Sequence, residues 1–430
     1  MTMKKILVPT IILLLVLGWG NIIGGNARER KNYNEHMSNA KAFDEKEIYI
    51  DALDQYKKAL EFTKDKLPVE KAILDDYLNL KKYKEFEKQG SMILEDYNYP
   101  KEITKKVVDY YMERKQSANA LKVVNAYLER QPNDDEFLEL QGKLRGIYTE
   151  IYFAGASIDE FCNGFYVFTN NDKKGLMKSD GSEKIKSQYD DILPYGKDPI
   201  YAPVCKDGEW YYIEKNGYKK LLPYFKVDLL GVFGNKLAPY KTGEKYSYMD
   251  EYAKKATELT YDFAGGFANK RAAVKKDGKW AVIKNDFSQI TDFIYDDVIM
   301  DDLGFATSQN VYIAKLDGKY HIFDLDGNMK GSEGFDDAKA FVSDDIAAVK
   351  MNNKWCFANK NGEIELMTEY RNAKSFSNGF AAVYNGKKWG YINKKATVVI
   401  DFDFSEAGCF NSSGVAAVKK GTWKFIKLVE

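Results

Sequence analysis

The chain has 430 residues, which is too long for one ordinary hydrophobic core and predicts two or three domains. Its 64 basic and 64 acidic side chains balance, so the composition gives no sign of the basic surface that nucleic-acid binding requires. Aromatic residues make up 14% of the chain, a richness that suits half-buried β-strands.

An apolar run extends from Ile6 to Gly25 near the N-terminus. About 20 apolar residues can cross a bilayer of ~30 Å as a helix, whereas the apolar part of a signal peptide spans about 7 to 15 residues. An uncleaved anchor is therefore favoured: residues 1–30 are predicted to be a transmembrane anchor or signal segment that meets the membrane through residues 6–25. A cleaved signal peptide stays open, because Gly25-Asn26-Ala27 resembles a small-residue cleavage site.

Basic residues flank this run on both sides, so the positive-inside rule does not settle its orientation. Lys4 and Lys5 precede the run, and Arg28, Arg30 and Lys31 follow it. A single N-terminal segment more commonly keeps its N-terminus inside. We therefore expect a membrane-anchored protein that faces the extracytoplasmic side, or a secreted protein if the segment is cleaved.

Residues 31–150 change to the periodicity of helices, and equivalent positions recur there at a constant interval. The three registers are Phe43, Tyr77 and Tyr111; Ala52, Phe86 and Ala120; and Tyr56, Gly90 and Val124. A bulky residue that faces a small one lets two helices pack closely as a hairpin. An amphipathic segment from Phe137 to Ile147 is expected to cap the last open face.

This helical region resembles the tetratricopeptide family. The family pattern of a small residue, an aromatic four later and a small residue three after that is met by Ala52, Tyr56 and Ala59. The middle unit departs from it, with Phe86 and Gly90 at the corresponding positions. The resemblance implies binding of a peptide or partner domain on a concave surface, and a plain helical bundle or coiled spacer is the alternative.

Residues 151–430 contain a second repeat, and one mostly aromatic position, which we call the anchor, recurs in every unit. The anchors are Lys174, Trp210, Tyr246, Trp280, Tyr320, Trp355, Trp389 and Trp423, and their spacing is nearly constant except for a wider step from Trp280 to Tyr320. Fifteen residues after each of the first seven anchors comes a second aromatic, at Tyr189, Phe225, Tyr261, Tyr295, Phe335, Tyr370 and Phe404. Because the anchor and the second aromatic keep the same separation in each of these units, we interpret these residues as structural.

Asn-Gly and Asp-Gly pairs between the repeat segments are predicted to form β-hairpin turns, because both residues tolerate positive φ. Examples are Asp207-Gly208 and Asn385-Gly386. The unit resembles the bacterial WG-repeat family, named for a Trp-Gly pair that is intact here only at Trp389 and Gly390. The resemblance implies a β-rich repeat that is common in cell-surface or envelope proteins.

Repeat fragments at the two ends of this region add up to one split unit. Tyr152 to Glu160 aligns with the last third of a repeat, and Gly414 to Lys427 supplies a first hairpin with nothing after it. A closed propeller needs such a split if both ends share its last blade, whereas a solenoid needs polar caps. The predicted fold is therefore multidomain, α then β, with a closed β-propeller of seven or eight blades; an open β-solenoid-like array is the alternative.

No catalytic, cofactor or metal site is predicted, and we do not expect an enzyme. His36 and His321 are too few for a Ser/His/Asp site, and the four cysteines lack metal-ligand spacing. Asp324 begins an oxygen-rich stretch like a calcium loop, but its glycine comes too early, so a plain turn is favoured. The carboxylates that follow several second aromatics recur in equivalent units, which favours turn capping over catalysis.

The leading interpretation is a non-enzymatic, membrane-anchored scaffold that uses both repeats for protein–protein interaction. The alternative is an envelope carbohydrate-binding protein. Trp210, Tyr211 and Tyr212 resemble the Trp-Tyr-Tyr hairpins of wall-binding repeats, where aromatic faces stack on sugars or quaternary amines. A hydrolase site in the funnel of the ring is the least favoured reading.

Overall fold

The computed structural model describes residues 27–429 apart from 154–156, 160–164 and 179. It divides into two compact units, Met1–Leu144 and Arg145–Glu430, which we call the arm and the head. The predicted membrane segment, residues 6–25, lies outside the described residues. None of the helices that are described is long and apolar enough to cross a membrane.

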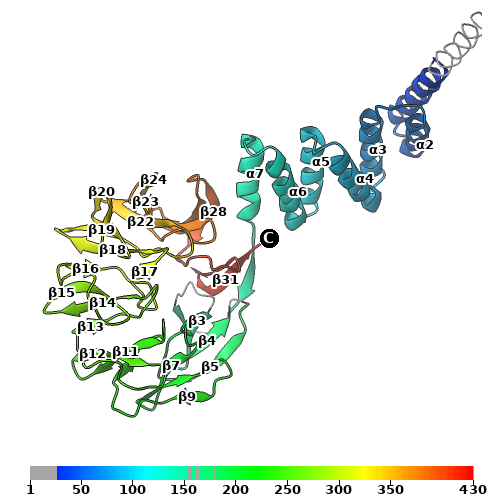
Figure 1. The fold of residues 1–430 in the computed structure, drawn as a ribbon. Coiled ribbons are helices and arrows are strands. Elements are labelled where there is room, and N and C mark those ends of the chain that lie inside the picture. Colours follow the sequence, from blue (N-terminus) through cyan, green and yellow to red (C-terminus); the bar gives the residue numbers. More distant parts are fainter. Residues whose placement is uncertain (1–26, 154–156, 160–164, 179, 430) are drawn as a thin grey trace, which may run out of the picture. The chain divides into compact units, whose positions relative to one another are not determined.

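The described part of the arm is a series of helical hairpins (Figure 1). Its first helix is described over residues 27–44. The following helices are α2 (Tyr49–Leu60), α3 (Leu67–Asn79), α4 (Tyr83–Asp96), α5 (Lys101–Glu113), α6 (Ser117–Arg130) and α7 (Asp135–Arg145). Apolar stripes on successive helices join into continuous hydrophobic clusters, which is the main stabilising force for helices of this length.

The buried face of the arm follows the repeating registers of the sequence. Ala52, Phe86 and Ala120 each expose 0% of their surface, and Tyr56 exposes 3%. Gly90 stands where the first hairpin has Tyr56, and a Cβ there would lie 3.0 Å from Val107 Cγ2. The middle hairpin thus exchanges the bulky and the small position, and the glycine makes room for α5.

One acidic cluster lies within this apolar core. Asp76 on α3 is 1% exposed, and Tyr56 donates its hydroxyl to Asp44 Oδ2 over 2.6 Å. Burial first, and then the neighbouring Asp44 carboxylate, raise the pKa of Asp76. The raised pKa of about 8 keeps the Asp76 carboxyl protonated and neutral near neutral pH.

The head consists of eight antiparallel sheets, which we number as blades 1 to 8 in chain order (Figure 1). Blades 1 to 4 are formed by β2 (Ser157–Asp159), β3 (Phe165–Asn170), β4 (Lys173–Lys178) and β5 (Glu183–Tyr189); β6 (Asp191–Ile192), β7 (Ala202–Lys206), β8 (Glu209–Ile213) and β9 (Lys219–Leu221); β10 (Leu229–Leu230), β11 (Leu237–Thr242) and β12 (Lys245–Asp250); and β13 (Phe263–Ala264), β14 (Arg271–Lys276) and β15 (Lys279–Lys284).

Blades 5 to 8 follow the same order of strands. They are formed by β16 (Asp297–Val298), β17 (Thr307–Ser308), β18 (Val311–Leu316), β19 (Lys319–Asp324) and β20 (Met329–Phe335); β21 (Asp337–Ala338), β22 (Ile346–Met351), β23 (Lys354–Asn359) and β24 (Ile364–Tyr370); β25 (Asn372–Ala373), β26 (Phe380–Tyr384), β27 (Trp389–Asn393) and β28 (Val398–Phe404); and β29 (Glu406–Ala407), β30 (Val415–Lys420), β31 (Thr422–Leu428) and β1 (Tyr148–Tyr152).

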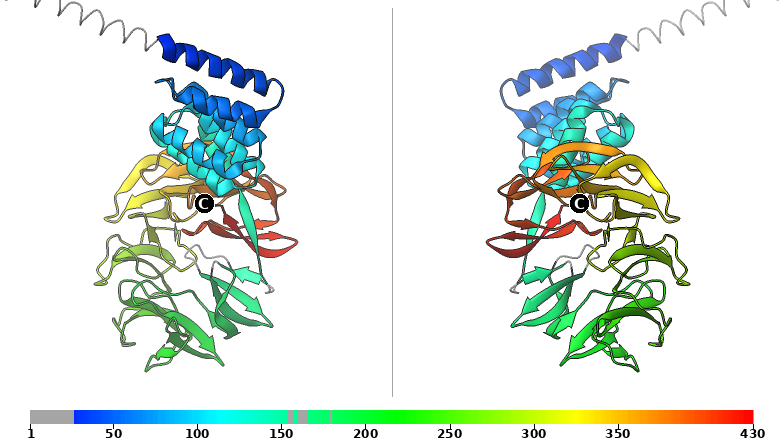
Figure 2. Two further views of the ribbon diagram at one scale, coloured as in Figure 1. Left: turned by 90° about the vertical axis from the view of Figure 1, so that its right-hand side faces the viewer. Right: turned by 90° about the vertical axis from the view of Figure 1, so that its left-hand side faces the viewer.

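The two ends of the head meet in blade 8. β1 pairs antiparallel with β31, with Thr149 opposite Lys427 and Tyr152 opposite Lys424. Figure 2 shows these two strands side by side from two directions. Phe153 and Phe425 then close blade 8 onto blade 1, with ring centroids 6.2 Å apart. The predicted closed propeller is confirmed with eight blades, and the open array is wrong because both ends supply strands to one sheet.

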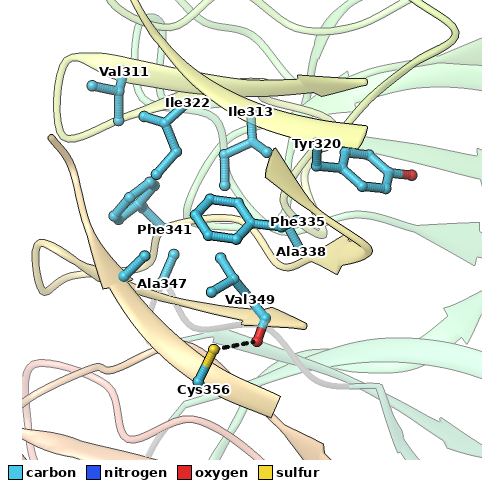
Figure 3. Close-up of a cluster of buried hydrophobic side chains, with 11 residues drawn as sticks. Val311, Ile313, Tyr320, Ile322, Phe335, Ala338, Phe341, Ala347, Val349 and Cys356 are labelled. Carbon is cyan, nitrogen blue, oxygen red and sulfur yellow. Dashed lines mark hydrogen bonds between the residues drawn. The ribbon is translucent and has the colours of Figure 1, made fainter. Parts of the chain in front are cut away.

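The contact between neighbouring blades, which we call a seam, is a layer of apolar side chains. Figure 3 shows the seam between blades 5 and 6, where Ile313 and Phe335 face Phe341 and Val349. Small residues let the sheets approach, as Ala347 does with 0% exposure. β22 places Ala347 in the seam to blade 5 and Ala348 in the seam to blade 7, which accounts for the Ala-Ala-Val pattern of the repeat.

Candidate functional site

The repeating aromatics lie inside the blades. An anchor and its second aromatic are cross-strand partners, as in Trp355 opposite Tyr370 and Trp389 opposite Phe404. The anchors Trp210, Trp280, Tyr320 and Trp355 and the second aromatics Tyr189, Tyr261 and Tyr295 each expose 9% or less. Tyr246, Tyr370, Trp389 and Trp423 are half-buried. These side chains stabilise the blades and their seams.

The glycine of the Trp-Gly pair has a steric role. A Cβ on Gly390 would lie 2.8 Å from the carbonyl oxygen of Ile400 on β28. Real Cβ atoms do not approach backbone oxygen so closely, so the neighbouring strand would have to move. Gly390 therefore allows β28 to lie close to β27 in blade 7.

The carboxylates that follow the second aromatics connect blades in pairs. Lys245 donates to Asp262 over 2.6 Å, and it holds the pKa of Asp262 below its ordinary value. The backbone N–H groups of Asp277 and Gly278, in the hairpin turn of the next blade, contribute to the same shift. We call this arrangement the carboxylate clasp; its other members are Lys173 with Asp190, Lys279 with Asp296 and Lys319 with Asp336.

The three aromatics considered for ligand stacking do not form one exposed platform. Trp210 is 8% exposed and Tyr212 is 0% exposed, and Tyr212 donates its hydroxyl to the Gly231 carbonyl over 2.7 Å. Tyr211 points to the other face of β8, where Lys219 Nζ lies 4.3 Å from its ring centroid. Alternation along the strand thus separates Tyr211 from its neighbours.

The calcium-like stretch forms a turn. Asp324 Oδ1 accepts N–H groups from Asp326 at 3.0 Å and from Asn328 at 2.9 Å, so the carboxylate caps its own turn. Cys205 and Cys356 are buried free thiols, Cys409 is buried, and Cys162 lies outside the described residues. Over the described residues, no group of three or more His, Cys, Asp and Glu side chains is placed to hold a metal ion.

A loop from blade 5 crosses the centre of the ring. The wider step from Trp280 to Tyr320 reflects extra residues after β16. Asp301 folds them into a compact turn by accepting the N–H groups of Leu303 at 3.0 Å and Phe305 at 2.9 Å. We call residues 300–305 the central loop.

The central loop contacts blades on the far side of the ring. Leu303 packs against the cluster shared by blades 1 and 2, and Lys197 Nζ of blade 2 lies 5.6 Å from the Phe305 ring centroid. Gly266 of blade 4 donates its N–H to the Gly304 carbonyl over 2.8 Å. A Cβ on Gly266 would lie 2.7 Å from the Phe305 ring, so the glycine is required there. The loop therefore lies across the middle of the propeller, where it contacts blades 1, 2 and 4.

A shallow pocket opens at the seam between blades 6 and 7. It is lined by Thr368, Glu369, Tyr370, Asn385 and Ala396. The sequence analysis did not predict this pocket, although an unusual residue beside it was visible in the sequence. The position that holds the clasp carboxylate in other units is Arg371 in this one.

Comparison with protein families supports the repeat assignment. Five segments match the model of the WG-containing repeat, at residues 175–210, 247–280, 334–355, 357–389 and 389–421. The head therefore carries WG-containing repeats, as the Trp389-Gly390 resemblance predicted. A search of curated proteins gave no significant match.

Among solved structures, the chain is similar to several proteins at low identity. A structure described as the eukaryotic initiation factor has 10% identity and a TM-score of 0.41, with 63% of this chain and 83% of that chain covered. Hsv2 of Kluyveromyces lactis has 9% identity and a TM-score of 0.36, with 64% and 100% covered. The Neurospora crassa Pan2 WD40 domain has 10% identity and a TM-score of 0.31, with 63% and 87% covered.

Proposed function

We propose that the protein is a non-enzymatic binding scaffold, anchored in a membrane through residues 6–25, whose arm and head bind other proteins. One observation carries the proposal. The repeating aromatics, lysines and carboxylates are used inside the blades and seams, which leaves the exposed loops and strand ends as the variable surface. Repeat and propeller folds present binding surfaces in this way, on loops held by a rigid scaffold.

The arm is proposed to be a tetratricopeptide-like array. Ala52, Tyr56 and Ala59 lie buried between helices, as that pattern requires. Ile50 and Met92 are apolar and expose 67% and 47% of their surface. Exposed apolar side chains on a helical array are suited to contact with a partner.

Blades 2 and 3 support a binding role for the head. Tyr218, Tyr224 and Tyr252 are 74%, 90% and 65% exposed. Tyrosine is enriched where interfaces concentrate their binding energy. The WG-repeat matches skip residues 211–246, so this part of the head departs from the repeat pattern.

Photo-cross-linking of the full chain in its native cells tests the proposal. A photoreactive amino acid is placed at exposed Tyr224 or Ile50, with fully buried Tyr248 as the matched control. We expect discrete cross-links to other proteins from the exposed positions and none from Tyr248. The proposal fails if neither exposed position captures protein above the control.

We also propose that the head and arm face the extracytoplasmic side, which rests on the N-terminal segment alone. Protease added to intact cells should then digest the head, and protection in intact cells with digestion after lysis would contradict this orientation. A carbohydrate ligand is the alternative function. Co-sedimentation with cell-wall material that Tyr211→Ala abolishes in a folded protein would favour it.

A further inference from the structure

The clasp position lacks a carboxylate in three blades, and two of these blades are neighbours. Sixteen residues after their anchors, blades 1, 3, 4 and 5 carry Asp190, Asp262, Asp296 and Asp336. Blades 6 and 7 carry Arg371 and Ser405 at the same position. Blade 2 carries Lys226 there, and this lysine forms an ion pair with Asp228. The repeat therefore replaces the carboxylate by a cation in blades 2 and 6 and by a hydroxyl in blade 7, and the replacements in blades 6 and 7 adjoin each other.

These two replacements leave cations without partners. Lys388 occupies the position of Lys279, which binds Asp296, but its own counterpart is Ser405. Arg371, Lys387 and Lys388 are exposed, and none of the three forms an ion pair within the described residues. Arg371 Cγ lies 3.5 Å from the place of a Cβ on Gly386. Three unpaired cations thus surround one hairpin turn.

The shallow pocket between blades 6 and 7 lies beside this turn. Asn385 and the half-buried ring of Tyr370 are part of its lining. Asn385 Oδ1 accepts the N–H groups of Lys387 at 2.9 Å and Lys388 at 3.0 Å, so the turn is capped without a clasp carboxylate. The one acid in the lining, Glu369, binds Lys354 over 2.6 Å. The pocket therefore combines an aromatic ring with positive charge and no unpaired lining carboxylate.

We propose that this seam binds an aspartate or glutamate side chain from an acidic segment of a partner protein. The chain supplies the template, because in blades 1, 3, 4 and 5 an aspartate binds between a lysine and the turn of the next blade. Arginine presents a planar fork of donors that matches a carboxylate. Arginine and tyrosine are also the residue types that dominate interface energies. This site rests on the proposed protein-binding function and gives it a location.

The test measures binding of a fluorescent peptide of alternating Asp and Gly to the full-length protein, by anisotropy at low salt. The matched peptide of alternating Asn and Gly is the chemical control. We expect the acidic peptide to bind, the amide peptide to bind at least tenfold more weakly, and the affinity to fall as salt screens the charges.

Two variants locate the site. Arg371→Asp restores the carboxylate of the other seams, so it should keep or raise the unfolding temperature while weakening acidic-peptide binding at least tenfold. Lys360→Asp makes the same charge change at an exposed lysine in the turn between β23 and β24, and it should leave binding within about twofold.

Three results would overturn the proposal. The first is unchanged binding in a folded Arg371→Asp variant. The second is an equal loss in Lys360→Asp, which would indicate a general charge effect. The third is tight, Arg371-dependent binding of inorganic phosphate or of vesicles with anionic lipid and none of the acidic peptide, which would assign the cations to another ligand. If cross-linking from Tyr224 or Ile50 still captures proteins, the seam site fails and the scaffold function stands.

Discussion

Trp355 is 4% exposed and joins β23 to β24 by pairing with Tyr370. Its neighbours in the seam to blade 7 include Phe357 and Phe376. Replacing a buried Trp by Ala typically costs about 3–5 kcal/mol, because burial is lost and a cavity remains. We predict this loss for Trp355→Ala in urea unfolding followed by circular dichroism.

The control for this variant is Tyr224→Ala, which removes a ring that is 90% exposed. A surface truncation of this kind changes stability by roughly 0.5 kcal/mol or less. If both variants lost the same amount, the repeat aromatics would not be the structural residues of the head.

The buried carboxyl of Asp76 in the arm predicts that stability depends on pH. The folded state binds a proton on Asp76 more tightly than the unfolded state, whose aspartate pKa is roughly 4. Stability should therefore fall as pH rises from roughly 4 toward the raised pKa of about 8, by at most about 1.4 kcal/mol per pH unit. Asp76→Asn should flatten this slope.

Two signals separate the arm from the head in this measurement. Residues 27–144 contain no tryptophan, so tryptophan fluorescence reports mainly on the head, while circular dichroism at the helix band follows the arm. We expect the Asn variant to change only the helix signal. A wild-type arm whose stability rises between pH 5 and pH 8 would contradict a buried, protonated Asp76.

At the scale of single residues, the sequence correctly identified the repeat aromatics as structural, because strand pairing sets their spacing. It did not reveal the clasp. Lys279 and Asp296 are 17 residues apart in sequence, and they meet because their neighbours Trp280 and Tyr295 are cross-strand partners. The regular lysine one residue before the anchors was visible in the sequence, but its partner was not.

Among the helices, the middle hairpin has Gly90 where the first hairpin has the bulky Tyr56, and the glycine leaves space for the neighbouring helix. A side chain at this position would meet Val107 of the next hairpin. We predict that Gly90→Val destabilises the arm by about 1–3 kcal/mol, as overpacking usually does. Thermal unfolding at the helix band measures the effect, and Ser91→Val at the exposed neighbouring position is the control. Equal stability of the two variants would mean that α5 can move away freely.

For the central loop, the sequence indicated only the presence of extra residues and not their position in the fold. The wider step between two anchors shows that blade 5 has extra residues, but local patterns do not say that Leu303 reaches blades 1 and 2. We predict that Leu303→Ala speeds amide hydrogen exchange in residues 193–197, 231–234 and 265–268. Exchange in residues 103–108 of α5 should not change, since the arm is a separate compact unit.

Met367→Ala is the control for the loop, because Met367 exposes 72% of its surface on β24. Its exchange pattern should match that of the wild type. Faster exchange spread evenly over all blades after Leu303→Ala would contradict a local role of the loop at the ring centre.

For the whole molecule, the order of an α-helical arm before a β-repeat head followed from the periodicity of the sequence. The split unit at the two ends of the head was the decisive clue to closure, because one end supplies the strand that completes the sheet of the other end. The count of eight could not be fixed in advance, since blades 3 and 4 have three strands and blade 5 has five. The candidate site at the seam of blades 6 and 7 could not be predicted from the sequence. Its cations are recognised as lacking a partner carboxylate only when they are compared with the clasps of the other blades.

A designed disulfide across the shared blade tests the closed ring most directly. Thr149 and Lys427 are both exposed and are register partners on β1 and β31. Partners in an antiparallel pair lie about 4.5–5.5 Å apart between Cα atoms, within the range that a disulfide spans. The double variant Thr149→Cys, Lys427→Cys should oxidise within the monomer, and mass spectrometry should find the two terminal peptides of the head joined. Thr149→Cys with Lys360→Cys should give no such link, and free thiols at 149 and 427 in the folded protein would contradict the closed propeller.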